Sequence, residues 1–440
     1  MDSIILSRIQ FALNAGFHFI FPPITIGLTL IILIIESKFL RTRDDTHKKL
    51  SQFLIKILGL VFALGVASGI VLEFSFGTNW AGYSRMVGDI FGAPLAAEGI
   101  SAFFLESVFL GVLLFGREKV SPKVYWLSSL LVFIASHLSG LWILIANSWM
   151  QTPAGFKLLG GKAVITDFSA AMLNPSVLER VLHTIIASYI TGSLFVAGIA
   201  AWYLIKNRDI KHAKPLFQLS IIIFIITAFL QFLTGHAHSV QVGKTQPEKM
   251  AAFEALWETR AGAPLSVFGI PSEKDRKTYL KVEIPRLLSL LIYFDSKAKV
   301  QGLNEFKKDE TPPVFLPFTM YHLMIGLGSL FALVSVISLI LLARKKIYDT
   351  KWYLYLMLFI SPLPLIANET GWIAAEVGRQ PWAVYRVLKT VDAASVTVPA
   401  WQILFSLIVF SLIYILLLAV FVRLLMKIIK NGPGNVKSGY

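Results

Sequence analysis

The chain has 440 residues, of which 55% are hydrophobic and only 15% are charged, and this composition excludes an ordinary soluble protein. The absence of cysteine excludes disulfides, thiolate-ligated haem, covalently attached c-type haem and cysteine-held iron–sulfur clusters within the chain. The net charge of +15 comes from basic residues in short segments between apolar runs, so it indicates orientation in a lipid bilayer and not binding to nucleic acid.

Nine apolar runs are long enough to cross a hydrocarbon core of about 30 Å, which takes about 20 helical residues. They are 11–36, 52–75, 93–115, 124–146, 183–205, 216–235, 319–343, 353–377 and 398–422. Pro362 and Pro364 predict a kink in the eighth run. The expected fold class is an all-α integral membrane protein, a bundle of about nine transmembrane helices.

The basic residues indicate how the chain is oriented in the membrane. The connections 37–51, 205–215 and 344–351 hold five, four and four Lys or Arg residues, whereas 76–92 holds one. Since cytoplasmic loops are rich in Lys and Arg, we expect the N-terminus outside and the C-terminus in the cytoplasm. An odd number of spans agrees with this orientation.

A polar segment, 236–318, lies between the sixth and seventh runs on the expected outer side and is too long for an idle connection. Residues 246–257 within it predict a short helix, with Pro247 near its start. We therefore divide the chain into spans one to six (1–235), an outer loop (236–318), and spans seven to nine with a cytoplasmic tail (319–440).

A carboxylate and a guanidinium, Glu376 and Arg379, lie in the tryptophan-flanked stretch 371–382 at the end of the eighth run. A charge at membrane depth costs roughly 2.5–3.5 kcal/mol on insertion scales, and such residues usually line a cofactor, ion or substrate site. In a helix, Trp372 and Arg379 would share a face with Glu376, and Gly378 could serve as its C-cap. The alternative is an interfacial belt of tryptophan and arginine at headgroup level.

Four of the eight histidines lie in or beside apolar runs, where they could hold a haem iron: His18, His137, His183 and His322. We place His236 and His238 at the start of the outer loop. For His137 we expect a hydrogen-bonded core residue.

Imidazole with a thioether favours a low-spin electron-transfer haem of raised potential, a role that suits His183 with Met324. A site that activates dioxygen keeps one iron position open, so a single protein ligand such as His18 or Glu376 suits a high-spin haem. From the expected topology, these four candidate ligands lie toward the outer face at one depth.

Two carboxylates, Glu98 and Glu106, occupy the third run. In a regular helix they would lie about 12 Å apart along the axis and about 80° apart around it. Intramembrane acids often form proton relays, which Ser107, Ser139 and Asn147 could extend. The alternative is a pair of hydrogen-bonded structural acids.

These patterns resemble subunit I of the cytochrome bd family of quinol oxidases, through nearly the whole chain. The stretch 371–382, GWxxxExGRQPW, is similar to the signature of that family, and Ser7-Arg8-Ile9-Gln10-Phe11-Ala12 followed by His18 resembles its opening. The resemblance implies that His18 and Glu376 ligate high-spin haem, that His183 and Met324 ligate a low-spin b haem, and that Arg8, Trp372 and Arg379 contact haem. It also implies a catalytic proton path through Glu98, Glu106, Ser107 and Ser139. Quinol binding is implied for Lys249 and Glu254, in a short outer "Q-loop". One departure is His322, which stands where the family usually has arginine, two residues before the methionine.

The resemblance further implies a haem-bearing catalytic subunit in a bacterial cytoplasmic (inner) membrane, which oxidises quinol at the outer face and reduces dioxygen to water with protons drawn from the cytoplasm. It implies two b-type haems and one d-type haem, no copper, and a second membrane subunit, with a small single-span subunit left open. The same axial ligands serve both macrocycles, so an oxidase of this fold with b-type haems alone stays an alternative. From another class, a haem-free proton-coupled transporter would also use intramembrane acids and histidines.

Overall fold

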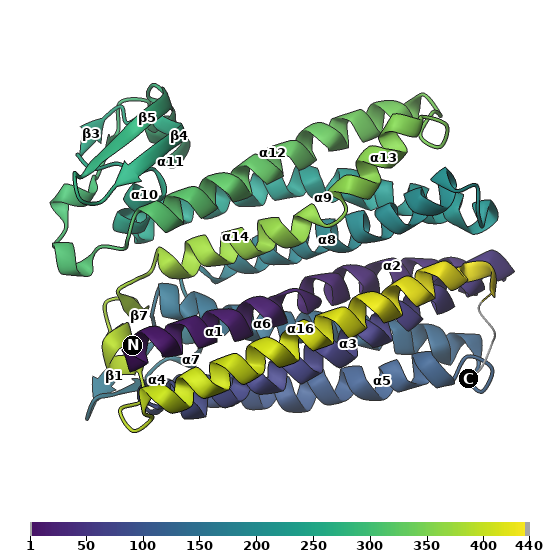
Figure 1. The fold of residues 1–440 in the computed structure, drawn as a ribbon, viewed down its shortest axis with the longest axis horizontal. Helices are drawn as coiled ribbons and strands as arrows, with labels where there is room; N and C mark the ends of the chain where they lie inside the picture. Colours follow the sequence, from purple (N-terminus) through teal and green to yellow (C-terminus); the bar gives the residue numbers. More distant parts are fainter. Residues whose placement is uncertain (1, 436–440) are drawn as a thin grey trace.

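The computed structural model describes residues 2–435 and forms an elongated bundle whose long helices run along one axis (Figure 1). Nine helical segments among these residues are long and apolar enough to cross a membrane, as the sequence predicts. They are α1 (Ser3–Phe19) with α2 (Phe21–Thr42), α3 (Asp45–Thr78), α4 (Ala81–Ala97) with the π-helix η1 (Glu98–Phe103) and α5 (Phe104–Phe115), α6 (Pro122–Gln151), α7 (Phe168–Met172) with α8 (Val177–Ile205), α9 (Ile210–Thr245), α12 (Phe315–Ala343), α13 (Lys351–Ile360) with α14 (Leu363–Val377), and α16 (Ala400–Asn431).

One end of the bundle carries the non-membrane segment between α9 and α12, and we call it the loop end (Figure 1). This segment contains α10 (Pro247–Phe253), β3 (Arg260–Ala261), β4 (Leu265–Ser272), β5 (Lys277–Ile284), α11 (Leu287–Tyr293), β6 (Lys299–Val300) and the 3₁₀ turns η2 (Leu303–Glu305) and η3 (Lys308–Glu310). Strands β4 and β5 form an antiparallel hairpin, with Leu265 opposite Ile284. The segment is therefore a folded unit and not an extended connection.

Smaller elements complete the chain. They are the antiparallel pairs β1 (Phe156–Leu159) with β2 (Lys162–Ile165) and β7 (Trp382–Val384) with β8 (Leu388–Lys389), the short helix α15 (Thr390–Ala393), and the 3₁₀ turn η4 (Pro433–Asn435).

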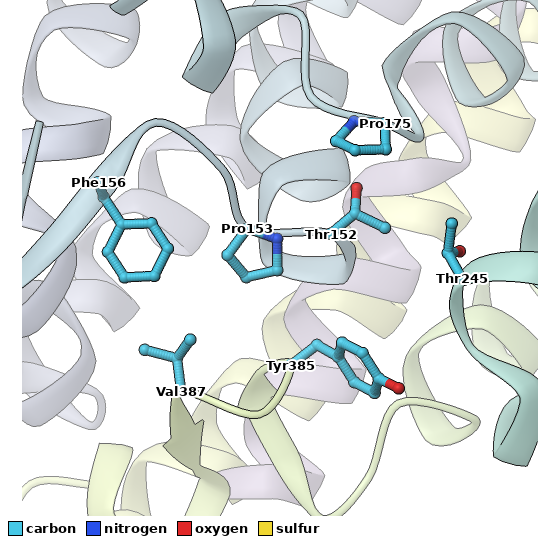
Figure 2. A pocket seen from close by; sticks show the side chains of 7 residues that line it. All are labelled: Thr152, Pro153, Phe156, Pro175, Thr245, Tyr385 and Val387. Carbon is cyan, nitrogen blue, oxygen red and sulfur yellow. The ribbon is translucent and has the colours of Figure 1, made fainter. Parts of the chain in front are cut away.

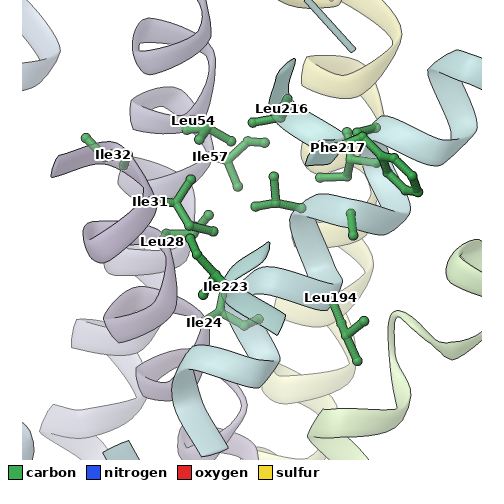
Figure 3. Packing of buried hydrophobic residues seen from close by; sticks show 14 of the residues in the cluster. Ile24, Leu28, Ile31, Ile32, Leu54, Ile57, Leu194, Leu216, Phe217 and Ile223 are labelled. Atoms are coloured by element: carbon green, nitrogen blue, oxygen red, sulfur yellow. The ribbon is translucent and has the colours of Figure 1, made fainter. Parts of the chain in front are cut away.

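Aliphatic side chains from four helices fill the middle of the bundle (Figure 3). Leu28 and Ile31 of α2 pack with residues of α3, α8 and α9 in one buried cluster. The backbones of α2 and α8 meet where both helices carry glycine, because a Cβ built on Gly27 would lie 2.6 Å from the Cα of Gly192. Small residues allow such close approach between membrane helices, where lipid supplies no hydrophobic drive for association.

Two local predictions are confirmed and one is wrong. The helix of the eighth span breaks between Ile360 and Leu363, at the predicted prolines, and α10 begins at Pro247 as predicted. The outer loop, however, does not start at residue 236, because α9 continues to Thr245. The polar turns at this end of α9 stay helical since they pack against α10 and α11 instead of entering water.

The third span also departs from the regular helix assumed for its two acids. Residues Glu98–Phe103 form a π-helix, so the spacing of about 12 Å and 80° calculated for an α-helix does not apply between Glu98 and Glu106. The sequence carries Pro94 shortly before this turn. Single π turns inside α-helices are frequent at functional sites.

Candidate functional site

Glu376 lies at the loop end, on the last turn of α14, and accepts hydrogen bonds from two amides of α6. Asn147 Nδ2 lies 2.9 Å and Gln151 Nε2 3.2 Å from Glu376 Oε1. Arg379 Nη2 lies 2.5 Å from Glu376 Oε2, and Gly378 caps the helix between the two charged residues, as the sequence predicts. The two amides of α6 thus hold one carboxylate oxygen of Glu376, and Arg379 holds the other.

Two more cations join this network from other elements. Arg180 of α8 donates from Nη1 to Asn147 Oδ1 at 3.3 Å. Lys249 of α10 donates from Nζ to the side-chain oxygens of Gln151 and Gln246. Arg180, Lys249 and Arg379 have relative exposures of 6%, 1% and 7%, so three buried basic side chains belong to the network around one carboxylate.

Several nitrogen atoms of this network have no hydrogen-bond partner although they are buried. They include Arg180 Nε and Arg379 Nη1. Burial, followed by the charges of Arg180 and Arg379, lowers the pKa of Lys249 well below its usual range. Even with Lys249 neutral, two guanidinium groups face one carboxylate, and the site as it stands has a surplus of positive charge and unused donors.

His183 lies one turn after Arg180 on α8 and faces α9. Gln231 Nε2 lies 3.1 Å from His183 Nδ1, and the rings of His183 and His238 meet edge to face with centroids 5.5 Å apart. His238 Nε2 is buried without a partner. The placement of His238 in an outer loop is therefore wrong, because the longer α9 brings it beside a predicted haem ligand.

Met324 of α12 packs against α14. A Cβ built on Gly371 would lie 2.6 Å from Met324 Sδ, so the glycine of the 371–382 stretch leaves room for the thioether. Met324 and His183 occupy different interfaces of the bundle, α12–α14 and α8–α9.

His322 is held by the segment at the loop end. Its Nδ1 lies 2.8 Å from Phe318 O and its Nε2 lies 2.9 Å from Ser266 O, which precedes the hairpin turn on β4. Both ring nitrogens thus face backbone carbonyl oxygens, and the side chain contacts β4.

His18 lies near the end of α1 and packs on α3. Its Nδ1 lies 3.1 Å from Ser68 Oγ, and Gly69 provides space beside the ring. A Cβ built on Gly16 would lie 3.4 Å from Glu369 Oε2, and Glu369 is two turns, or about 10 Å, before Glu376 on α14. The expectation that His18 and Glu376 lie at one depth is wrong, because α1 begins at Ser3 and carries His18 deeper into the bundle.

The other two residues of the predicted haem surroundings differ in exposure. Arg8 is exposed on α1, whereas Trp372 is half-buried on α14. Among the residues that the structure describes, no hydrogen bond or ion pair joins Arg8 to the network around Glu376.

Of the predicted proton-relay residues, the structure joins Glu98 to Ser139. Ser139 Oγ donates to Glu98 Oε1 at 2.7 Å. Glu106 is buried, and its Oε1 has no partner. Ser107 donates to Phe104 O on its own helix, and Asn147 binds Glu376 and Arg180 instead of extending the relay.

His137 is a hydrogen-bonded core residue, as expected. Its Nδ1 lies 2.6 Å from Phe133 O, and its Nε2 lies 2.7 Å from the hydroxyl of Tyr189.

Lys249 and Glu254 point into different surroundings, although only five residues separate them. Lys249 reaches α6 and the Glu376 network, whereas Glu254 Oε2 accepts from the backbone N–H of Ser266 on β4 at 2.8 Å. Burial raises the pKa of Glu254 to about 8, against the opposing effects of the Ser266 N–H and Lys281. Although α10 belongs to the predicted outer loop, the Lys249 side chain enters the bundle and reaches Gln151 of α6.

A cavity of about 380 Å³ opens at the loop end (Figure 2). Tyr385, which lines it, donates to Glu248 of α10 at 2.7 Å. The lining residues are Thr152, Pro153, Phe156, Pro175, Thr245, Tyr385 and Val387. A second hollow of about 450 Å³ shares Pro175 and Thr245 with it and is lined also by Glu179, His236 and Lys244.

Sequence reasoning missed Arg180, Gln151 and His238. The signal for Arg180 was available, since a residue three positions before His183 shares its helical face. The signal for Gln151 and His238 was weaker, because both lie where the apolar pattern has already ended.

Comparisons with known proteins agree on one family. The family model for cytochrome bd terminal oxidase subunit I matches residues 6–433. The chain is 37% identical over 442 residues to the cytochrome bd ubiquinol oxidase subunit 1 of Bacillus subtilis, covering 98% of this chain and 94% of that protein. It is 34% identical to the cytochrome bd-II ubiquinol oxidase subunit 1 of Escherichia coli, covering 99% and 98%.

A solved structure shares the fold. A chain of the bd oxidase from Geobacillus thermodenitrificans superposes with a TM-score of 0.92 at 31% identity, covering 98% of this chain and 99% of that chain. With the family model matching almost the whole sequence, the chain belongs to the cytochrome bd terminal oxidase subunit I family.

Proposed function

We propose that this chain is the haem-bearing catalytic subunit of a bd-type terminal oxidase, an oxidoreductase that oxidises quinol and reduces dioxygen to water. The observation that carries the proposal is the surplus of buried positive charge around Glu376. Family membership supports the same activity, because the relatives are ubiquinol oxidase subunits. It does not support the haem-free transporter.

The residues around Glu376 fit haem, because each haem carries propionate carboxylates. Arg180 Nε and Arg379 Nη1 are buried donors without partners. A buried donor left unpaired costs about 1–3 kcal/mol, and more when it is charged. Propionates would accept from these nitrogens and balance the guanidinium charges.

The ligand assignment follows the donor types. His183 and Met324 would hold a low-spin b-type haem, and His18 and Glu376 would each provide one ligand to a high-spin haem. Bound haem supplies the one-electron chemistry and the oxygen reduction that no side chain of this chain can perform. One carboxylate oxygen of Glu376 would then bind the iron in place of its present partners, and the other oxygen would keep the partner that it has now, Asn147 for Oε1 or Arg379 for Oε2.

The chain's own acids would deliver protons. Glu98, held by Ser139, and the buried Glu106 lie on the third span and would relay protons drawn from the cytoplasm, with Ser107 beside Glu106. The distribution of Lys and Arg supports a loop end that faces outside, so this relay would run from the opposite end of the bundle.

Quinol would be oxidised at the loop end, with Lys249 and Glu254 contributing to the site. Both are buried, and the raised pKa of Glu254 keeps its carboxyl protonated at neutral pH. It would therefore donate a hydrogen bond to the substrate, and it would act as a base only after releasing that proton. The two residues would reach the substrate from different sides, since they face different elements.

We also propose which haems this chain holds, which subunit it binds and in which membrane it lies. We infer two b-type haems and a third haem of d or b type, without copper, since the ligands serve either macrocycle. A second membrane subunit would pack against the exposed apolar faces of the bundle. An oxidase with a further small single-span subunit is an alternative. The location would be the bacterial cytoplasmic membrane.

The test is a pair of ligand variants with spectra of the purified oxidase. His183→Ala and Met324→Ala should each abolish the low-spin b signal and leave part of the high-spin absorbance, because only the low-spin iron needs two protein ligands. His137→Ala is the matched control, since that histidine is hydrogen-bonded in the core. Unchanged low-spin spectra in both ligand variants would refute the assignment.

His322→Ala and His238→Ala extend the test to neighbouring histidines. If Met324→Ala keeps a low-spin spectrum that a second change at His322 or His238 removes, that histidine is the ligand instead. A pyridine haemochrome spectrum of the wild type separates d-type from b-type haem at the third position.

A further inference from the structure

Arg180 is a buried guanidinium for which the sequence analysis predicted no role. It lies on α8 with 6% exposure and makes one side-chain hydrogen bond, from Nη1 to Asn147 Oδ1 at 3.3 Å. Its Nε is buried without a partner. A guanidinium cannot lose its charge in a protein, so this group requires an anionic or polar acceptor, and residues 2–435 do not provide one for its Nε.

Two sites that we assign to different haems meet at Arg180. His183 follows it by three residues on α8, so the two side chains lie one helical turn apart on the same face. Through Asn147, whose Nδ2 donates to Glu376 Oε1 at 2.9 Å, the same arginine is connected to Glu376. One side chain therefore lies between the low-spin and the high-spin ligand.

The planar fork of arginine suits such a position. Its five N–H donors point in fixed directions, so Nε and Nη1 can serve two acceptors at once, which an ammonium on a flexible stem does less well. Arg379 already neutralises Glu376 directly, at 2.5 Å. The charge of Arg180 is therefore available for another anion.

We propose that Arg180 is a positioning residue shared by two haem sites: its Nε binds a propionate of the haem held by His183, while its Nη1 orients Glu376 through Asn147. The inference rests on the proposed function. A positive charge beside a haem stabilises the reduced form, which carries one more electron. Arg180 thus raises the potential of the low-spin haem and connects it mechanically to the ligand of a high-spin haem.

The experiment is a redox titration of each haem in the purified two-subunit oxidase, followed by optical spectra. Arg180→Gln should shift the low-spin redox equilibrium at least tenfold toward the oxidised form, which is about 59 mV for one electron. Arg180→Lys keeps the charge and loses the fork, so it should give a smaller shift in the same direction. Asn147→Leu cuts only the connection to Glu376 and should alter the high-spin spectrum while the low-spin potential stays unchanged.

Arg386→Gln is the matched control, because Arg386 is a half-exposed cation at the same end, paired with Glu248 at 3.3 Å. It should move neither potential. A wild-type low-spin potential in Arg180→Gln with both haem types retained would overturn the inference. If Arg180→Gln does not assemble, Arg180→Lys decides alone: a lowered low-spin potential supports the role, and wild-type potential with full haem content overturns it.

The inference and the proposed function fail differently. A wild-type protein without a Soret band would contradict the haem-bearing function itself. A wild-type protein with its haems, but with potentials indifferent to Arg180, would leave the function intact and remove only the role of this arginine.

Discussion

At the residue scale, burial decides what the polar groups of this chain can do. Glu254 is 1% exposed, and its Oε1 has no hydrogen-bond partner. Its raised pKa of about 8 therefore follows from lost hydration, which the Ser266 N–H and the more distant Lys281 offset only in part. The folded chain consequently binds one more proton than the unfolded chain between about pH 4.5 and pH 8.

This proton gives a prediction for stability. Because the folded pKa is raised above the unfolded one, folding stability should fall with rising pH across this interval, by up to about 1.4 kcal/mol per pH unit from this one group. Glu254→Gln removes the titration, so the loss of melting temperature between pH 6 and pH 9 should be smaller in the variant. Melting curves of the purified protein at several pH values measure it, and parallel wild-type and variant slopes would contradict the raised pKa.

At the scale of elements, the crossing of α2 and α8 depends on two glycines. A Cβ on Gly27 would lie 2.6 Å from both Gly192 Cα and Ser188 O, and these are backbone atoms that cannot rotate away. Overpacking at a close-packed site typically costs 1–3 kcal/mol. The two helices can meet this closely only because neither has a side chain at the contact.

Gly27→Ala should therefore lower the melting temperature clearly and reduce the yield of folded protein. Gly111→Ala on α5 is the control, because no heavy atom lies within 4 Å of the added methyl group. Its only expected effect is the helix-propensity gain of roughly 0.5–1 kcal/mol. Equal melting temperatures for the two variants would show that α2 and α8 separate at little cost.

The elements also show where sequence reasoning succeeds. The number of spans, the break at Pro362 and the helix that starts at Pro247 follow from apolar length and from proline geometry, which act locally. The end of α9 could not be predicted in this way. His238 stays helical because α10 and α11 bury that turn, and this is a tertiary effect.

In the candidate site, too, local contacts could be predicted from the sequence and tertiary contacts could not. Glu376 and Arg379 are neighbours in sequence, so their ion pair could be predicted from helical spacing. Arg180, Asn147 and Gln151 reach Glu376 from α8 and α6, and no local pattern encodes that meeting. For the same reason the sequence predicted Lys249 as an outer-loop residue but not its contact with Gln151 of α6.

At the scale of the whole molecule, the residues proposed for electron transfer and those proposed for proton transfer lie toward opposite ends of the bundle. The candidate electron-transfer and quinol residues gather at the loop end, whereas the third span carries its acids toward the opposite end. Glu98 lies in the π turn, and Glu106 follows on the first turn of α5. In the proposed orientation Glu106 is the station nearer the cytoplasm, and Glu98 is nearer the haem ligands.

The arrangement predicts different results for the two glutamates. Glutamine keeps the shape and most hydrogen bonds of glutamate but removes its titratable proton. Glu106→Gln should therefore slow oxygen consumption and charge movement together, by at least tenfold, or about 1.4 kcal/mol in the barrier, while the haem content stays normal. Glu98→Gln also changes the acceptor of Ser139, so it should lower the high-spin haem content in addition.

Oxygen uptake and membrane potential in liposomes, with haem content measured on the same samples, provide the test. Ser411→Ala on α16 is the control, because that hydroxyl donates to Leu407 O on its own helix and this span carries no predicted relay residue. If electrons and protons are delivered from opposite sides of the membrane, each charge moved fully across is worth about 2.3 kcal/mol per 100 mV. Wild-type turnover and membrane potential in Glu106→Gln would contradict the relay. Glu98 and Glu106 would then be buried structural acids, and the protons would have to enter along another helix.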